Sequence, residues 1–317
     1  MKFRSFLKGL LWTLVALLFV FHVGAGWYFS DVLIADAFVP EPDTIELPES
    51  AGDLGLEEVT YESDLGEFDA WYIPASGDVW VIHVHGKGAT PAEAEPLFQP
   101  LKDAGYPQLS ITYRNDAGQP LDPSGHYRYG VTEWNEVSGA VDYAMDNGAS
   151  GVVLYGYSTG GAHIMSFMSR NMLTAVRGLV IDSGNFDMGN TVDAEAARRD
   201  LPVVPLPVPP TLSWVAKFIT SLRIDVNWQT INYIDDAGSL RTPVLLIHGT
   251  DDETVPVSQS RRFAEAAPDV ARLVVFEGVP DRTATWTSWP RAASPSATAR
   301  TCVDPPSVPG TVWSIAA

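Results

Sequence analysis

The stretch VVLYGYSTGGAHI, residues 152–164, decides the fold of this chain. Its first half is a continuous apolar run, typical of a β-strand buried on both faces, and the glycine pair after the serine opens a predicted helix. Between them, GYSTG (156–160) fits the pattern G-x-S-x-G. At a strand-to-helix turn this pattern strains the backbone and lifts the serine hydroxyl above the sheet edge. The stretch predicts Ser158 as a nucleophile, and a chance Gly-Ser turn is the alternative.

Strands and helices alternate around this stretch, which favours a mostly parallel sheet flanked by helices. The expected strands cover residues 57–63, 68–75, 79–86, 107–116, 152–156, 177–184, 242–249 and 271–278. The first two read as an antiparallel pair. The expected helices cover residues 91–105, 132–148, 160–172 and 258–268.

Residues 185–240 interrupt this alternation. LPVVPLPVPP (201–210) is too rich in proline for a helix or a central strand, and SWVAKFITSL (213–222) predicts a short helix. We interpret the segment as a short cap insertion over the site. A packing excursion without substrate contact is the alternative.

A His-Gly loop, HVHGKGAT (83–90), follows the first long apolar strand. A loop of this kind typically supplies half of an oxyanion hole. We expect the backbone N–H groups of Thr159 and Lys87 to be the two donors. His83 and His85 are expected to brace the loop by hydrogen bonds rather than to act in catalysis.

The stretch LLIHGTDDETVP (245–256) is the third piece, because two acids follow a strand that ends in His-Gly. With these motifs the sequence resembles the α/β-hydrolase family, and its membrane-anchored, esterase- or peptidase-like bacterial members in particular, over about residues 55–278. The order Ser…Asp…His of that family implies Asp252 as the acid of a catalytic triad. It also implies a hydrolase domain over residues 56–278, an acyl-enzyme mechanism and no cofactor or metal.

The resemblance places the base histidine after the last strand, at about residues 277–287, which read EGVPDRTATWT. No histidine follows the acid in the chain. Helical spacing turns His163 away from the face of Ser158, and His126 lies in a predicted loop, so neither is a natural base. The six histidines are His22, His83, His85, His126, His163 and His248.

The last residues, 279–317, differ from the rest of the chain, since 24 of these 39 are Pro, Ala, Ser or Thr and no amphipathic period is present. A shift in reading frame produces such a change. Residues 279–289, written in GC-rich codons and read two bases later, become Ala-Gly-Pro-His-Gly-His-Val-Asp-Val-Leu. We therefore expect an aberrant, disordered tail after a frameshift near residue 278, and a natural tail is the alternative.

The N-terminal segment LLWTLVALLFVFHVGAGWYF, residues 10–29, has the roughly 20 apolar residues that a membrane span requires. Basic residues precede it and acidic residues follow it, which predicts a cytoplasmic N-terminus and an extracytoplasmic domain. We expect a retained single-pass anchor over residues 1–30 and a linker over residues 31–55. A secreted protein, cleaved near residues 24–26, is the alternative.

The composition excludes some functions. The net charge of −19 repels phosphate backbones, so nucleic acid is not an expected partner. Cys302 is the only cysteine, so neither an internal disulfide nor a thiolate metal site is available. We expect a serine hydrolase for a small-molecule ester, lipid or peptide substrate, impaired by the missing histidine. A non-catalytic binding protein with the same fold is the alternative.

Overall fold

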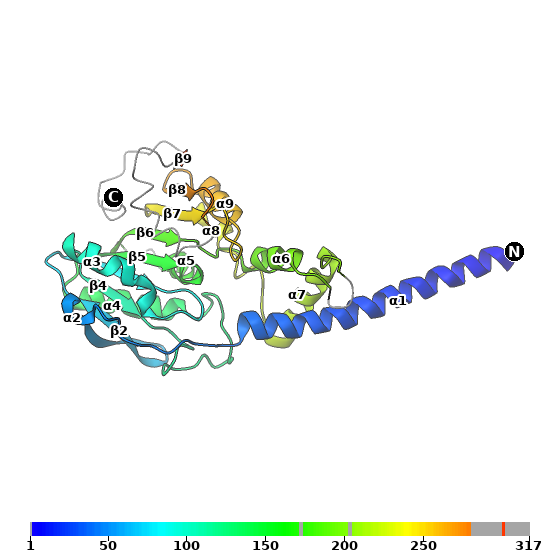
Figure 1. The fold of residues 1–317 in the computed structure, drawn as a ribbon, viewed down its shortest axis with the longest axis horizontal. Coiled ribbons are helices and arrows are strands. Elements are labelled where there is room, and N and C mark those ends of the chain that lie inside the picture. Colours follow the sequence, from blue (N-terminus) through cyan, green and yellow to red (C-terminus); the bar gives the residue numbers. More distant parts are fainter. Residues whose placement is uncertain (1, 171–173, 202–204, 280–299, 302–317) are drawn as a thin grey trace. The chain divides into compact units, whose positions relative to one another are not determined.

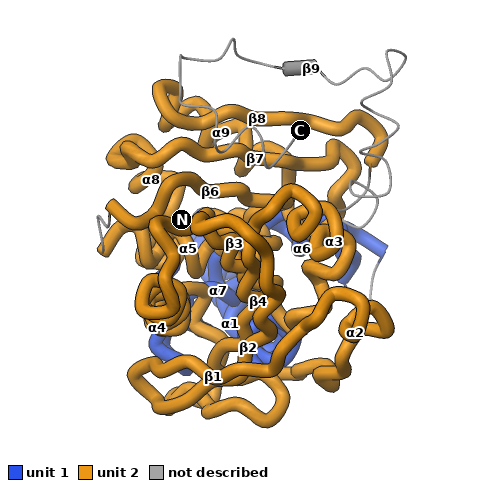
Figure 2. Tube along the Cα trace, turned by 90° about the vertical axis from the view of Figure 1, so that its left-hand side faces the viewer, with its two compact units in different colours: residues 1–39, 192–228 blue, residues 40–191, 229–317 orange. Residues whose placement is uncertain are grey.

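The computed structural model divides into two compact units (Figures 1 and 2). One unit comprises residues 1–39 and 192–228, and the other comprises residues 40–191 and 229–317. We call them the anchor unit and the sheet unit. The structure describes residues 2–170, 174–201, 205–279 and 300–301.

The sheet unit contains nine strands among the described residues, in the order β1-β2-β4-β3-β5-β6-β7-β8-β9. The strands are β1 (Glu57–Ser63), β2 (Gly66–Ile73), β3 (Val79–Val84), β4 (Gln108–Ile111), β5 (Gly151–Tyr157), β6 (Val176–Asp182), β7 (Val244–Gly249), β8 (Ala271–Phe276) and β9 (Arg300–Thr301).

Strands β4, β3, β5, β6, β7 and β8 pair in parallel, while β1, β2 and β9 pair antiparallel. Every residue of β5 and of β7 is buried, as expected for strands that are covered on both faces. The outer strand β1 instead alternates between exposed and less exposed residues. The predicted mostly parallel sheet, with its opening antiparallel pair, is therefore confirmed.

The helical segments are α1 (Lys2–Leu33), η1 (Ile34–Phe38), α2 (Ala51–Leu54), η2 (Pro91–Ala94), α3 (Glu95–Asp103), α4 (Trp134–Asp146), α5 (Thr159–Arg170), α6 (Met188–Arg198), α7 (Pro210–Ile224), α8 (Ile234–Ala237) and α9 (Ser258–Ala266). Adjacent residues of a strand point to opposite faces of the sheet. Tyr155 of β5 lies in a buried apolar cluster with Phe98 of α3. A Cβ on the next residue, Gly156, would lie 2.8 Å from the Gly161 nitrogen of α5 on the other face.

The anchor unit contains α1, η1 and α7. Helix α1 is long and apolar enough to cross a membrane, by length and composition. It runs three residues beyond the predicted anchor boundary at residue 30 and continues into η1. The cap predicted over residues 185–240 includes α6 and α7, and residues 192–228 of it belong to the anchor unit.

Most of the tail that we expect to be aberrant lies outside the described residues. The same is true of the predicted base loop beyond Val279. Within the described residues, Arg300–Thr301 pairs antiparallel with β8 as strand β9.

A buried ion-pair cluster ties the loop after β4 to helix α4. The guanidinium of Arg114 donates two hydrogen bonds to the carboxylate of Glu136, at 2.9 and 2.8 Å, and one to Asp122 at 3.3 Å. It also bonds the carboxylate of Asp64. Glu136 is fully buried, so Arg114 supplies the positive charge that this carboxylate needs inside the protein.

We predict that Arg114→Met lowers the free energy of unfolding by about 3–5 kcal/mol, because it leaves buried carboxylates without a counter-charge. Urea denaturation measures the change. The matched control is Arg261→Met at an exposed arginine, which should change stability by less than about 0.5 kcal/mol. Equal effects of the two substitutions would contradict the prediction.

Candidate active site

Ser158 lies at the tight turn between β5 and α5. Its φ of +49° is in the left-handed region, which side-chain-bearing residues rarely adopt. The Ser158 amide donates to the Asp182 carbonyl at 2.9 Å, and the Ser158 carbonyl accepts from the Gly161 and Asn185 amides at 3.1 and 3.0 Å. These backbone bonds hold the strained residue at the carboxyl end of β5, which is the geometry of a nucleophile elbow.

Three glycines make this turn possible by allowing close backbone contact. A Cβ on Gly160 would lie 2.1 Å from the carbonyl oxygen of Val84 and 2.8 Å from that of His85. On Gly161 it would lie 2.6 Å from the side chain of Ile181, and on Gly156 it would meet the start of α5. A larger residue at position 160 would separate the serine turn from the neighbouring loop after β3.

We predict that Gly160→Ala reduces stability by about 1–3 kcal/mol through overpacking against the Val84 carbonyl, a backbone atom with little room to move. Denaturation in urea measures this loss. Gly52→Ala is the control, since a Cβ on Gly52, in helix α2, has no heavy atom within 4 Å. An unchanged stability of Gly160→Ala would show that the contact is dispensable.

Two hydrogen bonds of the His85 ring brace the loop after β3. One ring nitrogen donates to the Gly86 carbonyl at 2.8 Å and the other donates to Asp116 at 2.9 Å. Burial lowers the pKa of His85, but the Asp116 carboxylate, the Gly86 carbonyl and the Glu93 carboxylate together raise the pKa above its usual value. The predicted bracing role of His85 is confirmed by these bonds. His83 is braced as well, by Gln108 at 3.1 Å.

Other side chains that brace this loop were not predicted from the sequence. The Gly86 amide donates to Glu93 at 2.7 Å, and the Tyr113 hydroxyl donates to the Gly86 carbonyl at 2.9 Å. Glu93 and Tyr113 follow the loop on different elements, and no local motif marks them. Together these bonds determine the path of the backbone at Lys87, whose amide is one of the two predicted oxyanion donors. The amide of Thr159, the other donor, is at the start of α5.

Asp252 lies in the turn after β7. Its Oδ1 accepts two backbone hydrogen bonds, from the amides of Thr254 and Val255, both at 2.8 Å. Its side chain is only 4% exposed, and Oδ2 lies 3.5 Å from Nε2 of His248. One carboxylate oxygen therefore holds the turn, as expected for an acid whose role is to orient another group.

His248 is part of the support of this turn. Its Nε2 donates to the Val255 carbonyl at 2.9 Å, and its Nδ1 accepts from the Ser260 hydroxyl at 2.8 Å. Because both ring nitrogens are used and the ring is fully buried, His248 positions the acid turn and is not available as a catalytic base.

The chain that follows β8 runs beside the acid turn. The Asp251 amide donates to the Val279 carbonyl at 3.0 Å, and the Gly278 amide donates to the Thr250 hydroxyl at 2.9 Å. Val279 is the last described residue of the predicted base loop, residues 277–287, before the gap in the described residues. A base histidine a few residues further along would therefore belong to a segment that starts beside the turn of Asp252.

None of the other described histidines has the position of a base. His163 is buried within α5 and meets the Tyr113 ring edge-on, with ring centroids 4.8 Å apart. Burial lowers its pKa to about 4. His126 lies in the loop before α4 with Nδ1 bonded to the Ser124 carbonyl at 2.7 Å.

We predict that the contribution of His163 to stability is lost as the pH falls from 6.5 towards 4. Between these values the unfolded chain binds a proton at His163, and the folded chain, whose pKa there is about 4, does not. The loss from this group is up to ~3 kcal/mol. Urea unfolding of His163→Phe should lack that part of the pH dependence. His126→Phe is the control in a partly exposed loop, and equal pH profiles for all three proteins would contradict the assignment.

The three predicted pieces leave the sheet from the same edge. The loop with Lys87, the turn with Ser158 and the turn with Asp252 follow the carboxyl ends of β3, β5 and β7, which run in parallel. β3 and β5 are neighbours, and β6 separates β5 from β7. Within the described residues, no group of three or more His, Cys, Asp and Glu side chains has the arrangement of a metal site.

Comparison with known proteins identifies a family, a curated protein and solved structures that are similar to this chain. The profile of the prolyl oligopeptidase family matches residues 95–276. The Escherichia coli K12 protein YfhR is 24% identical over 213 residues, which make up 65% of this chain and 66% of that protein's length. The Pyrococcus furiosus esterase Pf2001 has a TM-score of 0.62 at 20% identity, over 81% of this chain and 94% of that one. The acylaminoacyl peptidase of Pyrococcus horikoshii has a TM-score of 0.52 at 16% identity, over 70% and 37%.

Proposed function

Since the chain belongs to the prolyl oligopeptidase family and has its α/β-hydrolase fold, we propose that Ser158 is the nucleophile of a serine hydrolase that acts on carboxylic ester or amide bonds. The observation that carries this proposal is the left-handed backbone of Ser158 at the end of β5. A strained residue at this turn needs support from the surrounding structure, and such strain is concentrated at functional sites.

In the proposed reaction the Ser158 Oγ attacks the carbonyl carbon of the substrate and passes its proton to a base. The N–H groups of Thr159 and Lys87 bind the oxyanion that forms. Collapse of this intermediate releases the alcohol or amine and leaves an acyl-enzyme, which water hydrolyses. Asp252 orients the base and stabilises its positive charge, through the oxygen that the backbone amides of the turn leave open.

The proposed substrates are small-molecule esters, lipids or peptides. The support is general, since the structural relatives include an esterase and an acylaminoacyl peptidase. All of these substrates have the acyl carbonyl on which a serine nucleophile acts, and the described residues carry no feature that selects one of them.

The base is the part of the triad that this chain does not have. No histidine follows residue 248 in the sequence, and among the described histidines His248 and His85 have both ring nitrogens bonded, while His163 is buried within α5. We propose that turnover is impaired, leaving only the roughly 10³–10⁴-fold acceleration over water that remains in enzymes without a complete triad. The proposed frameshift near residue 278 would leave the serine turn, the acid turn and the oxyanion loop intact, since all of them precede it.

The test compares the chain as written with a chain whose residues after Gly278 are read in the alternative frame, which restores histidines to the base loop. We predict that the reframed protein hydrolyses a p-nitrophenyl ester at least about 100-fold faster, since general base catalysis contributes roughly 10²–10⁴-fold. It should also react with a fluorophosphonate probe at Ser158.

Ser158→Ala in the reframed protein is the control, and it should abolish both signals. Efficient turnover by the chain as written, lost on Ser158→Ala, would disprove the proposed impairment and direct attention to His126 or His163. A folded, reframed protein without turnover or labelling would instead favour the alternative, a binding protein that keeps the hydrolase fold.

For its location we propose a single-pass membrane protein whose α1 is retained as an anchor, with the sheet unit outside the cytoplasm. Cleavage near residues 24–26 would remove His22, which bonds Thr211 of α7 at 3.1 Å. It would also remove the close contact between Gly26 and Val215. A segment that is discarded after export has no need of such contacts with the mature chain.

A further inference from the structure

Helix α7 has an apolar face that no described residue covers. Trp214, Phe218 and Leu222 follow one another at intervals of four residues, so they lie on one side of the helix. Their exposed fractions are 65%, 53% and 73%. The rings of Trp214 and Phe218 stack with centroids 5.9 Å apart. Large apolar side chains gathered in this way indicate a surface that contacts a membrane or another protein.

The neighbouring side of α7 packs on α1, and the two helices run in the same direction. His22 bonds Thr211, Ser30 bonds Thr220 at 2.9 Å, and Asp31 pairs with Arg223 at 2.6 Å. The residue numbers on both helices rise together along this contact. The first turn of α7 therefore lies beside the middle of the apolar segment of α1.

This pairing determines how deep α7 lies if α1 spans a membrane. The aromatic residues 27–29 of α1 mark the outer interface, since Trp and Tyr gather at that level. His22 precedes Trp27 by five residues, or about 7.5 Å along the helix axis. Thr211 thus lies at the depth of the acyl chains, and Trp214 follows it on the exposed side.

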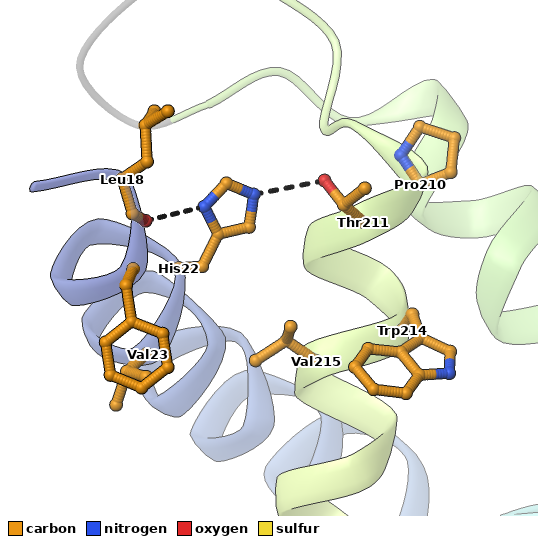
Figure 3. A pocket seen from close by; sticks show the side chains of 8 residues that line it. Leu18, His22, Val23, Pro210, Thr211, Trp214 and Val215 are labelled. Carbon is orange, nitrogen blue, oxygen red and sulfur yellow. Dashed lines mark hydrogen bonds between the residues drawn. The ribbon is translucent and has the colours of Figure 1, made fainter. Parts of the chain in front are cut away.

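The residues at this depth are compatible with an apolar environment. The segment Pro210–Ala216 of α7 carries no charge. The Leu18 carbonyl accepts from Nδ1 of His22 at 2.8 Å, and Nε2 accepts from the Thr211 hydroxyl (Figure 3). Both nitrogens of the neutral ring are therefore bonded, as a polar group within a membrane requires.

An apolar groove lies between the two helices at the same level (Figure 3). It has a volume of about 580 Å³ and is continuous with the exposed surface of α1. The His22 ring and the Thr211 hydroxyl, two polar groups of its lining, bond each other, and the lining also includes the indole of Trp214. The groove is lined by Leu18, Phe19, His22, Val23, Pro210, Thr211, Trp214 and Val215.

We propose that α7 is a second membrane-inserted element, which enters the outer leaflet beside α1 with lipid acyl chains against Trp214 and in the groove, and with Phe218 at the interfacial level of residues 27–29. The inference rests on the proposed anchor. Acyl chains are the occupant because the groove opens onto the surface of α1, and lipid acyl chains surround that surface in a membrane. The charged side chains of α7 come after Ala216 and are paired: Lys217, at the middle of the helix, pairs with Asp193 at 2.6 Å, and Arg223, in the last turn, pairs with Asp31.

The test places an environment-sensitive fluorophore, NBD, on single cysteines of the full chain in a Cys302→Ser background. The positions are Trp214→Cys and Phe218→Cys on α7, Leu14→Cys on α1 and Leu121→Cys as an exposed control of the sheet unit. The protein is reconstituted in phosphatidylethanolamine–phosphatidylglycerol vesicles that contain lipids with acyl-chain nitroxides. We expect quenching of roughly half the emission at Leu14 and Trp214, of a smaller fraction at the interfacial Phe218, and of less than about a tenth at Leu121.

The outcomes separate the inference from the anchor proposal. Quenching at Leu14 with none at Trp214 or Phe218 would overturn the inference and leave the anchor in place. No quenching at any position would overturn both. If the α7 positions are shielded from aqueous iodide but not quenched by the nitroxide lipids, protein covers this face. That result also overturns the inference, and reconstitution at one copy per nanodisc would show whether a second copy is the cover.

Discussion

The close contact between Gly160 and the carbonyl oxygens of Val84 and His85 is the constraint on which the candidate site depends. It brings the first turn of α5 against the loop after β3, the two elements that carry the proposed oxyanion donors. It also requires the strained backbone of Ser158, because a relaxed turn would move the helix away. The oxyanion loop, the nucleophile and the helix N-terminus are thus set by one packing contact that excludes any side chain.

The acid turn shows a different kind of support. Asp252 is held by backbone amides, and the buried His248 fixes the path of the same turn through Val255 and Ser260. The segment that follows β8 is bonded to this turn through Val279. Within the described residues, the acid turn and the start of the segment after β8 are therefore bonded to each other.

Much of the sheet was predictable because its strands are covered on both faces and read as continuous apolar runs. The serine turn was predictable because its glycines and its strand and helix lie within a dozen residues. The bracing of the oxyanion loop by Glu93 and Tyr113 was not predictable. These residues meet the loop only after β4 pairs with β3, and nothing in their local sequence marks them.

The sequence by itself determined the order of the strands and helices, the apolar length of α1, the serine and acid turns, and the absence of a histidine after residue 248. These depend on composition or on residues close together in the chain. Only the tertiary structure decided that His248 supports the acid turn and that α7 runs beside α1 in the same direction. Both follow from contacts that depend on how the chain folds back on itself, over nearly 190 residues between His22 and Thr211, and no local pattern determines such contacts.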